Sequence, residues 1–185
     1  MLRILTKHKL NTKIVSVDIQ DIVGIEGVQI IKGDITKQVT INKILNAFSD
    51  KKLELIICDG APDVTGSIDI DTYMQNQLLT YALIICLKLL KKDGKFVAKL
   101  FLEKGETDYY YEKLKCLFAY VHYYKPSSSR NSSHEIFVIC EGYMIEPEVQ
   151  KIIESLNIEN LINYSTILHE KTKNFLQFLI DSDYN

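Results

Sequence analysis

The sequence predicts an α/β protein with a mostly parallel sheet and one antiparallel strand at an edge. Short β-branched segments alternate with segments of helical spacing along the first two thirds of the chain. The last two expected strands are joined by the polar loop KPSSSRNSS, which is short enough for an antiparallel pair. Three successive strands end in aspartate. We therefore expect helices on both faces and a ligand site beyond the carboxyl ends of the strands.

Hydrophobic spacing sets the individual elements. Residues 38–48 carry apolar side chains at helical intervals, and the pattern of residues 70–90 ends in lysines followed by the turn Asp93-Gly94. The expected strands cover residues 13–17, 28–32, 53–58, 95–101, 119–124 and 134–141. The expected helices cover residues 38–48, 70–90, 106–118 and 146–156.

Composition places the chain among ordinary globular domains. It has 185 residues, of which 46% are hydrophobic and 25% charged, and this composition argues against disorder. A net charge of −2 neither indicates nor excludes a nucleic-acid partner. The four cysteines form no CxxC pair and lie in apolar segments, so we expect free thiols and a cytoplasmic, reducing location. The spacing of the histidines predicts no metal site. The sequence contains no uninterrupted apolar segment of about 18 residues or more, so we expect no membrane span.

The three strand-end carboxylates are Asp18, Asp34 and Asp59. A single aspartate after a strand is usually a turn former or a helix N-cap. Three of them at the ligand-binding edge of a parallel sheet favour a bound nucleoside, whose ribose hydroxyls and amine can pair with carboxylates.

The start of the chain departs from a complete nucleotide-binding fold. Such folds place a strand, a glycine-rich turn and a helix, roughly 20 residues or more, before the ribose-binding acid. Here 17 residues precede Asp18, and the first glycine is Gly24. We therefore expect the chain to lack the usual first, central strand and the glycine loop. The sheet would then have either a gap or a rearranged pairing of residues 13–17 with 54–58.

Six sequence blocks resemble one known family. In order they are VDIQ (17–20), GDIT (33–36), CDGAPDVTG (58–66), DTYMQNQLL (71–79), GKFVAKLF (94–101) and KPSSSRNSSHEIFVICEGY (125–143). Together they resemble the FtsJ/RrmJ-like RNA 2′-O-ribose methyltransferases, which have a Rossmann-like sheet. The residues of the third and last blocks are most similar to those of the eukaryotic subgroup that methylates the tRNA anticodon loop. The resemblance implies a methyltransferase domain over residues 1–143 and a partly helical C-terminal extension over 144–185.

The resemblance also implies roles for particular residues. The family uses a Lys-Asp-Lys-Glu tetrad, and its last three members fall on Asp59, Lys99 and Glu135. The first lysine belongs to a segment upstream of the glycine loop, and no lysine here matches it. The implied contacts to S-adenosylmethionine are Asp18, Ile19, Asp34, Ile35 and Asp59.

Chemistry supports these roles but leaves alternatives. A lysine acts as a general base only when its pKa falls from about 10.4. Lys99 alternates with Phe96, Ala98 and Leu100 near a strand's carboxyl end, where an aggregation-blocking edge lysine is the alternative. For Glu135 the alternative is a solvated glutamate at a strand start.

The polar loop before the last strand is a predicted RNA contact. Lys125, Ser128, Arg130 and Asn131 offer charge, hydroxyl and amide groups for phosphate and ribose. The alternative is a flexible polar turn. Tyr109, Tyr110 and Tyr111 could stack bases, although helical spacing directs at least one into the core.

The implied function is S-adenosylmethionine-dependent 2′-O-methylation of RNA, with tRNA anticodon-loop nucleotides as the first candidate. The alternatives are ribosomal RNA methylation, or an inactive truncated fragment that binds RNA or a partner protein. The resemblance further implies a helper protein that directs the modification site. Without the glycine loop and the first lysine, we expect the chain to be weak or inactive on its own.

Overall fold

The computed structural model describes residues 12–49, 51–60, 68–101, 106–129 and 134–145, together with the helical residues 151 and 153. The chain forms two compact units, residues 1–50 and residues 51–185, and each is described by itself. Within the described residues, no helix combines the length and apolar character needed to cross a membrane.

The described residues of the first unit form two parallel strands and one helix. Strand β1 (Ile14–Asp18) pairs with β2 (Val28–Lys32), and helix α2 (Gln38–Phe48) follows. The helix turns Ile41 and Ile44 inward, as its spacing predicts. Gly33 begins the connection from β2 to α2, and a Cβ atom there would lie 2.5 Å from the Oγ1 atom of Thr40. Only glycine therefore lets the strand pass so close to the helix.

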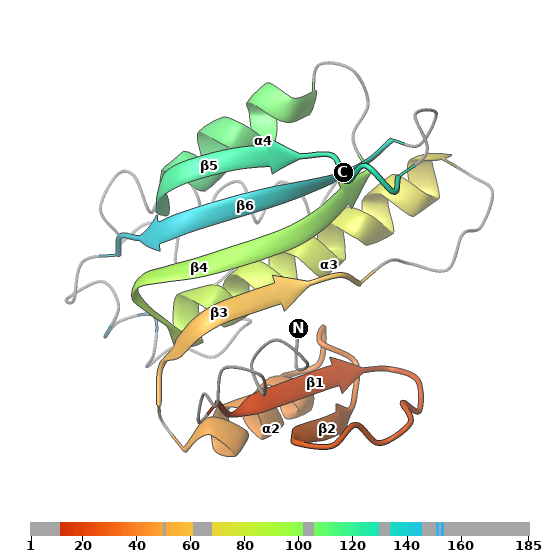
Figure 1. Ribbon diagram of the computed structural model, residues 1–185, viewed down its shortest axis with the longest axis vertical. Coiled ribbons are helices and arrows are strands. Elements are labelled where there is room, and N and C mark those ends of the chain that lie inside the picture. The colour runs from red at the N-terminus through yellow and green to blue at the C-terminus, as the bar shows by residue number, and fades with distance from the viewer. Residues whose placement is uncertain are drawn as a thin grey trace. The chain divides into compact units, whose positions relative to one another are not determined.

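The second unit is a four-stranded sheet with the order β3-β4-β6-β5 (Figure 1). Its strands are β3 (Leu53–Cys58), β4 (Leu90–Phe101), β5 (Phe118–Tyr124) and β6 (Glu135–Tyr143). β3 and β4 are parallel, whereas β6 runs antiparallel to both β4 and β5. The antiparallel strand thus lies one place in from the edge, and β5 is the edge strand.

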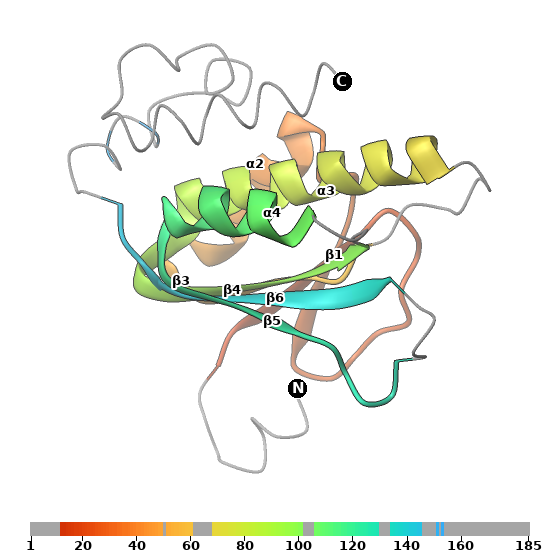
Figure 2. The same cartoon turned by 90° about the horizontal axis from the view of Figure 1, so that it is seen from above.

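Helices α3 (Ile68–Leu89) and α4 (Glu106–Lys115) cover the same face of this sheet (Figure 2). Phe96, Ala98 and Leu100 of β4 point to that face and are at most 1% exposed. Phe96 stacks on Phe118 at 6.2 Å between ring centroids. Because burial of one large apolar side chain contributes roughly 1.5–3 kcal/mol, this layer holds the sheet and helices together. The other residues of the strand, Lys99 among them, point to the opposite face.

The predicted fold class is confirmed, with four differences in detail. The antiparallel strand β6 lies inside the sheet and not at the predicted edge position. β4 begins at residue 90 instead of 95, because Leu90 already pairs with Leu53. The rearranged pairing of residues 13–17 with 54–58 is wrong, since β1 pairs with β2 and β3 with β4. Both described helices of the second unit lie on one face of its sheet, not on two. Most of the predicted helix 146–156 lies outside the described residues.

Candidate active site

A partly buried lysine and an exposed aspartate form an ion pair at the carboxyl edge of β3 and β4. The parallel register aligns Cys58 with Ala98, so the next residues, Asp59 and Lys99, are neighbours. The Nζ atom of Lys99 lies 2.8 Å from Oδ1 of Asp59. The Lys99 side chain is 16% exposed and the Asp59 side chain 68%. The Lys99 side chain therefore lies mostly below the protein surface, and the Asp59 carboxylate lies between its amine and the solvent.

Two further contacts fix the end of β4 around Lys99. The side-chain amide of Gln75, on α3, donates a hydrogen bond of 2.9 Å to the backbone oxygen of Lys99. Gln75 is buried, and its Oε1 atom accepts no hydrogen bond from the described part of the chain. The ring of Phe101 lies 6.0 Å from the Lys99 amine, at the outer limit of a cation–π contact. The backbone and the side chain of Lys99 are thus held by different elements.

Glu135 reaches the same edge from β6. In the antiparallel register Glu135 is opposite Phe101, and Phe137 is opposite Lys99. Residues opposite one another share a face, so Glu135 lies on the face of Lys99 at a diagonal position, roughly 7 Å away. The structure therefore brings the three predicted catalytic residues to one edge, with a direct ion pair only for Asp59 and Lys99 among the contacts described above. Their catalytic roles stay predictions.

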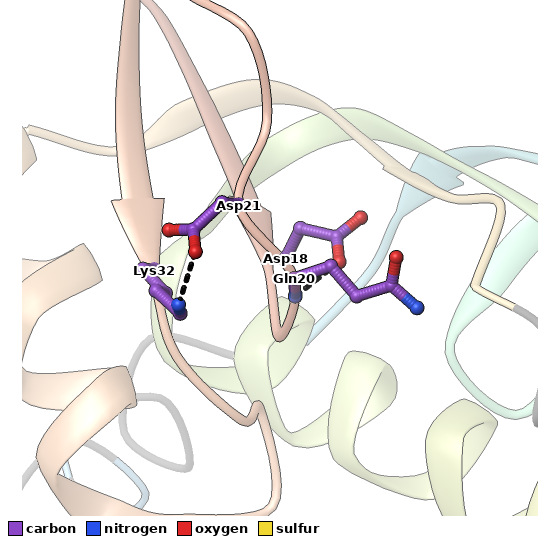
Figure 3. Close-up of polar contacts among 4 residues, drawn as sticks. All are labelled: Asp18, Gln20, Asp21 and Lys32. Carbon is purple, nitrogen blue, oxygen red and sulfur yellow. Dashed lines mark hydrogen bonds and ion pairs between the residues drawn. The ribbon is translucent and has the colours of Figure 1, made fainter.

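The predicted cofactor residues of the first unit lie at the ends of β1 and β2. The backbone N–H of Gln20 donates to Oδ1 of Asp18 at 2.8 Å, beside the ion pair of Asp21 with Lys32 (Figure 3). Oδ1 of Asp34 accepts from the backbone N–H and the hydroxyl of Thr36, at 2.9 and 2.8 Å. One oxygen of each carboxylate thus serves a local turn, as the simpler alternative predicts.

The remaining cofactor predictions differ in exposure. Ile19 is 64% exposed, whereas Ile35 is half-buried. Within the described residues the second oxygen of Asp18 and of Asp34 accepts no hydrogen bond. These oxygens are acceptors, which suits the hydroxyl and amine donors of a nucleoside. The hydrogen-bond acceptors of the first unit therefore fit the predicted cofactor.

The predicted RNA loop is described in part. Lys125 and Ser128 are exposed, and the backbone N–H of Ser129 closes a turn on the oxygen of Pro126 at 3.0 Å. The Lys125 amine also donates to the backbone oxygen of Glu135 at 3.5 Å, which ties the loop to the start of β6. Arg130 and Asn131 lie outside the described residues.

Cys58 precedes Asp59 but offers no nucleophile. Burial raises the pKa of its thiol, and the Asp59 carboxylate adds to that effect, while the Gly60 backbone and Lys99 oppose it. A neutral buried thiol is a poor nucleophile. The polar chemistry at this edge therefore comes from Asp59, Lys99 and Glu135.

Two residues next to Lys99 were missed in the sequence analysis, the buried Gln75 and the exposed Phe101. Gln75 shares a helical face with Leu79 and Ala82, which are buried. A polar residue on this apolar face is the sequence feature that could have pointed to Gln75. Tyr110, considered for base stacking, is instead buried with its hydroxyl bonded to Asn76.

An α/β sheet with a lysine–aspartate pair at its carboxyl edge is the arrangement that we expect of a Rossmann-like methyltransferase. More specifically, the chain belongs to the FtsJ-like methyltransferase family, whose sequence model matches residues 2–143. This finding confirms the family resemblance drawn from the six blocks.

Curated relatives and a solved structure agree with this membership. The human tRNA (cytidine(32)/guanosine(34)-2′-O)-methyltransferase is 47% identical over 130 residues, which are 70% of this chain and 39% of that protein. The ribosomal RNA large subunit methyltransferase E of Methanosarcina acetivorans is 39% identical over 135 residues, 73% of this chain and 49% of that protein. The chain thus spans less than half the length of either relative.

A ribosomal RNA methyltransferase structure from Plasmodium falciparum has the same fold. Its TM-score is 0.66 at 24% identity, over 77% of this chain and 79% of that chain. At this identity the likeness bears on the fold alone.

Proposed function

We propose that the protein transfers a methyl group from S-adenosylmethionine to a ribose 2′-hydroxyl of RNA, with the tRNA anticodon loop as its first target. The observation that carries this proposal is the Lys99–Asp59 ion pair, 2.8 Å long, at the carboxyl edge of an FtsJ-like sheet. The names of the human and other eukaryotic relatives support tRNA, whereas the archaeal relatives support ribosomal RNA as the alternative.

The strand-end carboxylates are the proposed cofactor contacts. Asp18 and Asp34 would accept hydrogen bonds from the ribose hydroxyls and the adenine amine, with Ile19 and Ile35 against the base. When bound, S-adenosylmethionine supplies an electrophilic methyl group. Asp59, 68% exposed beside Lys99, would favour binding of its positive charge.

Lys99 is the proposed general base. In its neutral form the amine accepts the proton of the 2′-hydroxyl, so that the ribose oxygen becomes the nucleophile. Asp59 and the backbone contact from Gln75 keep the amine in one position, which matters because in-line transfer depends chiefly on alignment. Glu135, diagonal to Lys99 on the same face, would hold the ribose or orient the amine.

The test is methyl transfer to purified tRNA with radiolabelled S-adenosylmethionine. Lys99→Ala should lower the rate by roughly 100-fold or more, the usual contribution of a general base. Lys95→Ala is the matched control, because Lys95 lies on the same strand and face and pairs with Glu141. We expect the control to keep most of the activity. Equal loss in both variants, or full activity of Lys99→Ala, would remove Lys99 from this role.

The position of the methyl group separates the remaining alternatives. A 2′-O-methyl group blocks alkaline cleavage of the neighbouring phosphodiester bond, so mapped resistance identifies the modified nucleotide. A parallel reaction with ribosomal RNA tests the second target. No transfer to either RNA by the wild-type protein would favour a role in which the chain binds RNA or a partner protein without methylating it.

Three predictions accompany this proposal. They are a helper protein that directs the modification site, a cytoplasmic location, and a domain boundary at residue 143. Transfer that begins only when a cell extract is added to the purified protein would support the helper protein. Full activity of the chain ended at residue 143 would support the boundary and argue against a catalytic role of residues 144–185.

A further inference from the structure

The face of the four-stranded sheet opposite α3 and α4 carries an ordered row of side chains at its carboxyl edge. By register Lys99 is beside Phe137 of β6, and Phe137 is beside Tyr124 of β5. Asp59 extends this alignment on the other side of Lys99. The site row, defined as Asp59, Lys99, Phe137 and Tyr124, thus follows the strand order β3-β4-β6-β5, with Asp59 directly after the end of β3.

Aromatic rings in and next to the site row are exposed. Tyr124 is 54% exposed and Phe101 is 41% exposed, whereas the rings that face the helices, Phe96 and Phe118, are completely buried. Phe101 points to the same face as Lys99, two residues further along β4, and lies opposite Glu135. Two large rings therefore remain open to solvent on either side of the Lys99–Phe137 pair, on the face where the proposed substrate would lie.

We propose that Tyr124 and Phe101 form a stacking platform for the RNA bases around the target ribose. This inference rests on the proposed function, because it takes the ribose to lie at Lys99. Every base has an aromatic face, so such a platform adds affinity with little sequence preference. It also holds a single-stranded loop in an extended form, in which a 2′-hydroxyl is accessible.

The spacing of the sheet assigns different bases to the two rings. Neighbouring strands lie about 4.8 Å apart, so Tyr124, two strands from Lys99, is roughly 10 Å from it. That distance places Tyr124 beyond the target nucleotide, at the base of a neighbouring nucleotide. Phe101, whose ring is 6.0 Å from the Lys99 amine, is within reach of the base of the target nucleotide itself.

The surrounding charges favour RNA over an apolar protein partner. The exposed Lys125 directly follows Tyr124, so this end of the platform offers a cation to phosphate. A protein-binding surface of the usual kind would instead have few charges at its centre. The combination of aromatic faces and lysines is that of a single-strand binding groove.

The experiment uses a single-stranded RNA of about ten nucleotides that contains 2-aminopurine, a base whose fluorescence falls when it stacks. Affinity is measured by fluorescence anisotropy, and stacking by quenching, at one fixed salt concentration. Tyr124→Ala should weaken binding at least fivefold and reduce quenching, and Phe101→Ala should do the same. Tyr124→Phe keeps the ring and should bind like the wild type.

Tyr120→Ala is the matched control. Tyr120 lies on the same strand and face, is 62% exposed, and is four residues from Tyr124, opposite Glu141. We expect its RNA affinity to stay within twofold of the wild type. If both alanine variants at Tyr124 and Phe101 bind and quench like the wild type while methyl transfer proceeds, the platform is refuted and the proposed function stands. If the wild type neither binds nor methylates RNA, both proposals fall.

Discussion

At the scale of single residues, the Lys99–Asp59 pair differs from other ion pairs of the same sheet. Lys95 with Glu141 and Lys91 with Glu54 join side chains that are all more than a third exposed, whereas the Lys99 side chain is 16% exposed. Exposed pairs contribute little to stability, because water screens them and ordering long side chains costs entropy. A lysine withdrawn from water next to one exposed carboxylate is better explained by function.

Asp59→Ala tests this distinction. Asp59 is mostly exposed, so its removal should change the free energy of unfolding by less than about 1 kcal/mol. Methyl transfer should nevertheless fall at least tenfold, because the Lys99 amine loses the partner that positions it. Thermal unfolding and the tRNA assay measure the two effects. Glu141→Ala is the control, and it should leave both quantities nearly unchanged; a parallel loss of activity and stability in Asp59→Ala would contradict the functional reading.

Residue identity could be predicted from the sequence better than residue environment. The motifs placed Asp59, Lys99 and Glu135, and the register of β3, β4 and β6 brings them to one edge. Burial of Lys99 could not be read from the alternation of its strand, which is equally typical of an exposed edge lysine. The hydrogen bond from Gln75 joins residues 24 positions apart, and no local pattern encodes such a contact.

At the scale of elements, the bounds of several helices and strands follow closely from local spacing. The predicted strand 53–58 and helix 38–48 agree with β3 and α2 residue for residue. The position of β6 inside the sheet did not follow, because a loop length predicts an antiparallel pair but not which member lies further in. The strand pairing in the structure resolves this point, since β6 pairs with β4 on one side and with β5 on the other.

Gly142, near the end of β6, is an element-scale requirement that can be tested. Its φ of +72° is in the left-handed region, and a Cβ atom there would lie 3.0 Å from the Cβ of Ala119 on β5. Both effects oppose a larger residue, so Gly142→Ala should lower the free energy of unfolding by about 1–2 kcal/mol. Urea denaturation measures the change. Gly24→Ala, where a Cβ would meet no atom within 4 Å, should have almost no effect, and a similar loss in both variants would rule out this explanation.

At the scale of the whole molecule, the core of the second unit contains thiols that affect stability at alkaline pH. Cys86 and Cys140 are buried, and burial raises the pKa of the Cys140 thiol from 9.0 to about 12 and that of Cys86 well above its ordinary value. The sequence predicted free thiols in apolar segments, and these two are free and buried. The sequence could not predict that Cys86 of α3 and Cys140 of β6 lie near each other, because only the folded structure brings these two elements together.

The consequence is a loss of stability that begins near pH 9. Below pH 9 both the folded and the unfolded chain hold the thiol protons, so the free energy of unfolding does not depend on them. Between pH 9 and about 12 the unfolded chain releases the Cys140 proton while the folded chain retains it, so stability falls as pH rises. The expected slope is about 1.4 kcal/mol per pH unit for one such thiol. Urea denaturation at a series of pH values measures this slope.

The variant Cys140→Ala tests the assignment to this thiol. It should be less stable at pH 7, because the substitution leaves a small cavity, yet its stability should fall less steeply above pH 9. An unchanged slope in that variant would mean that other groups, such as tyrosines, control the alkaline transition.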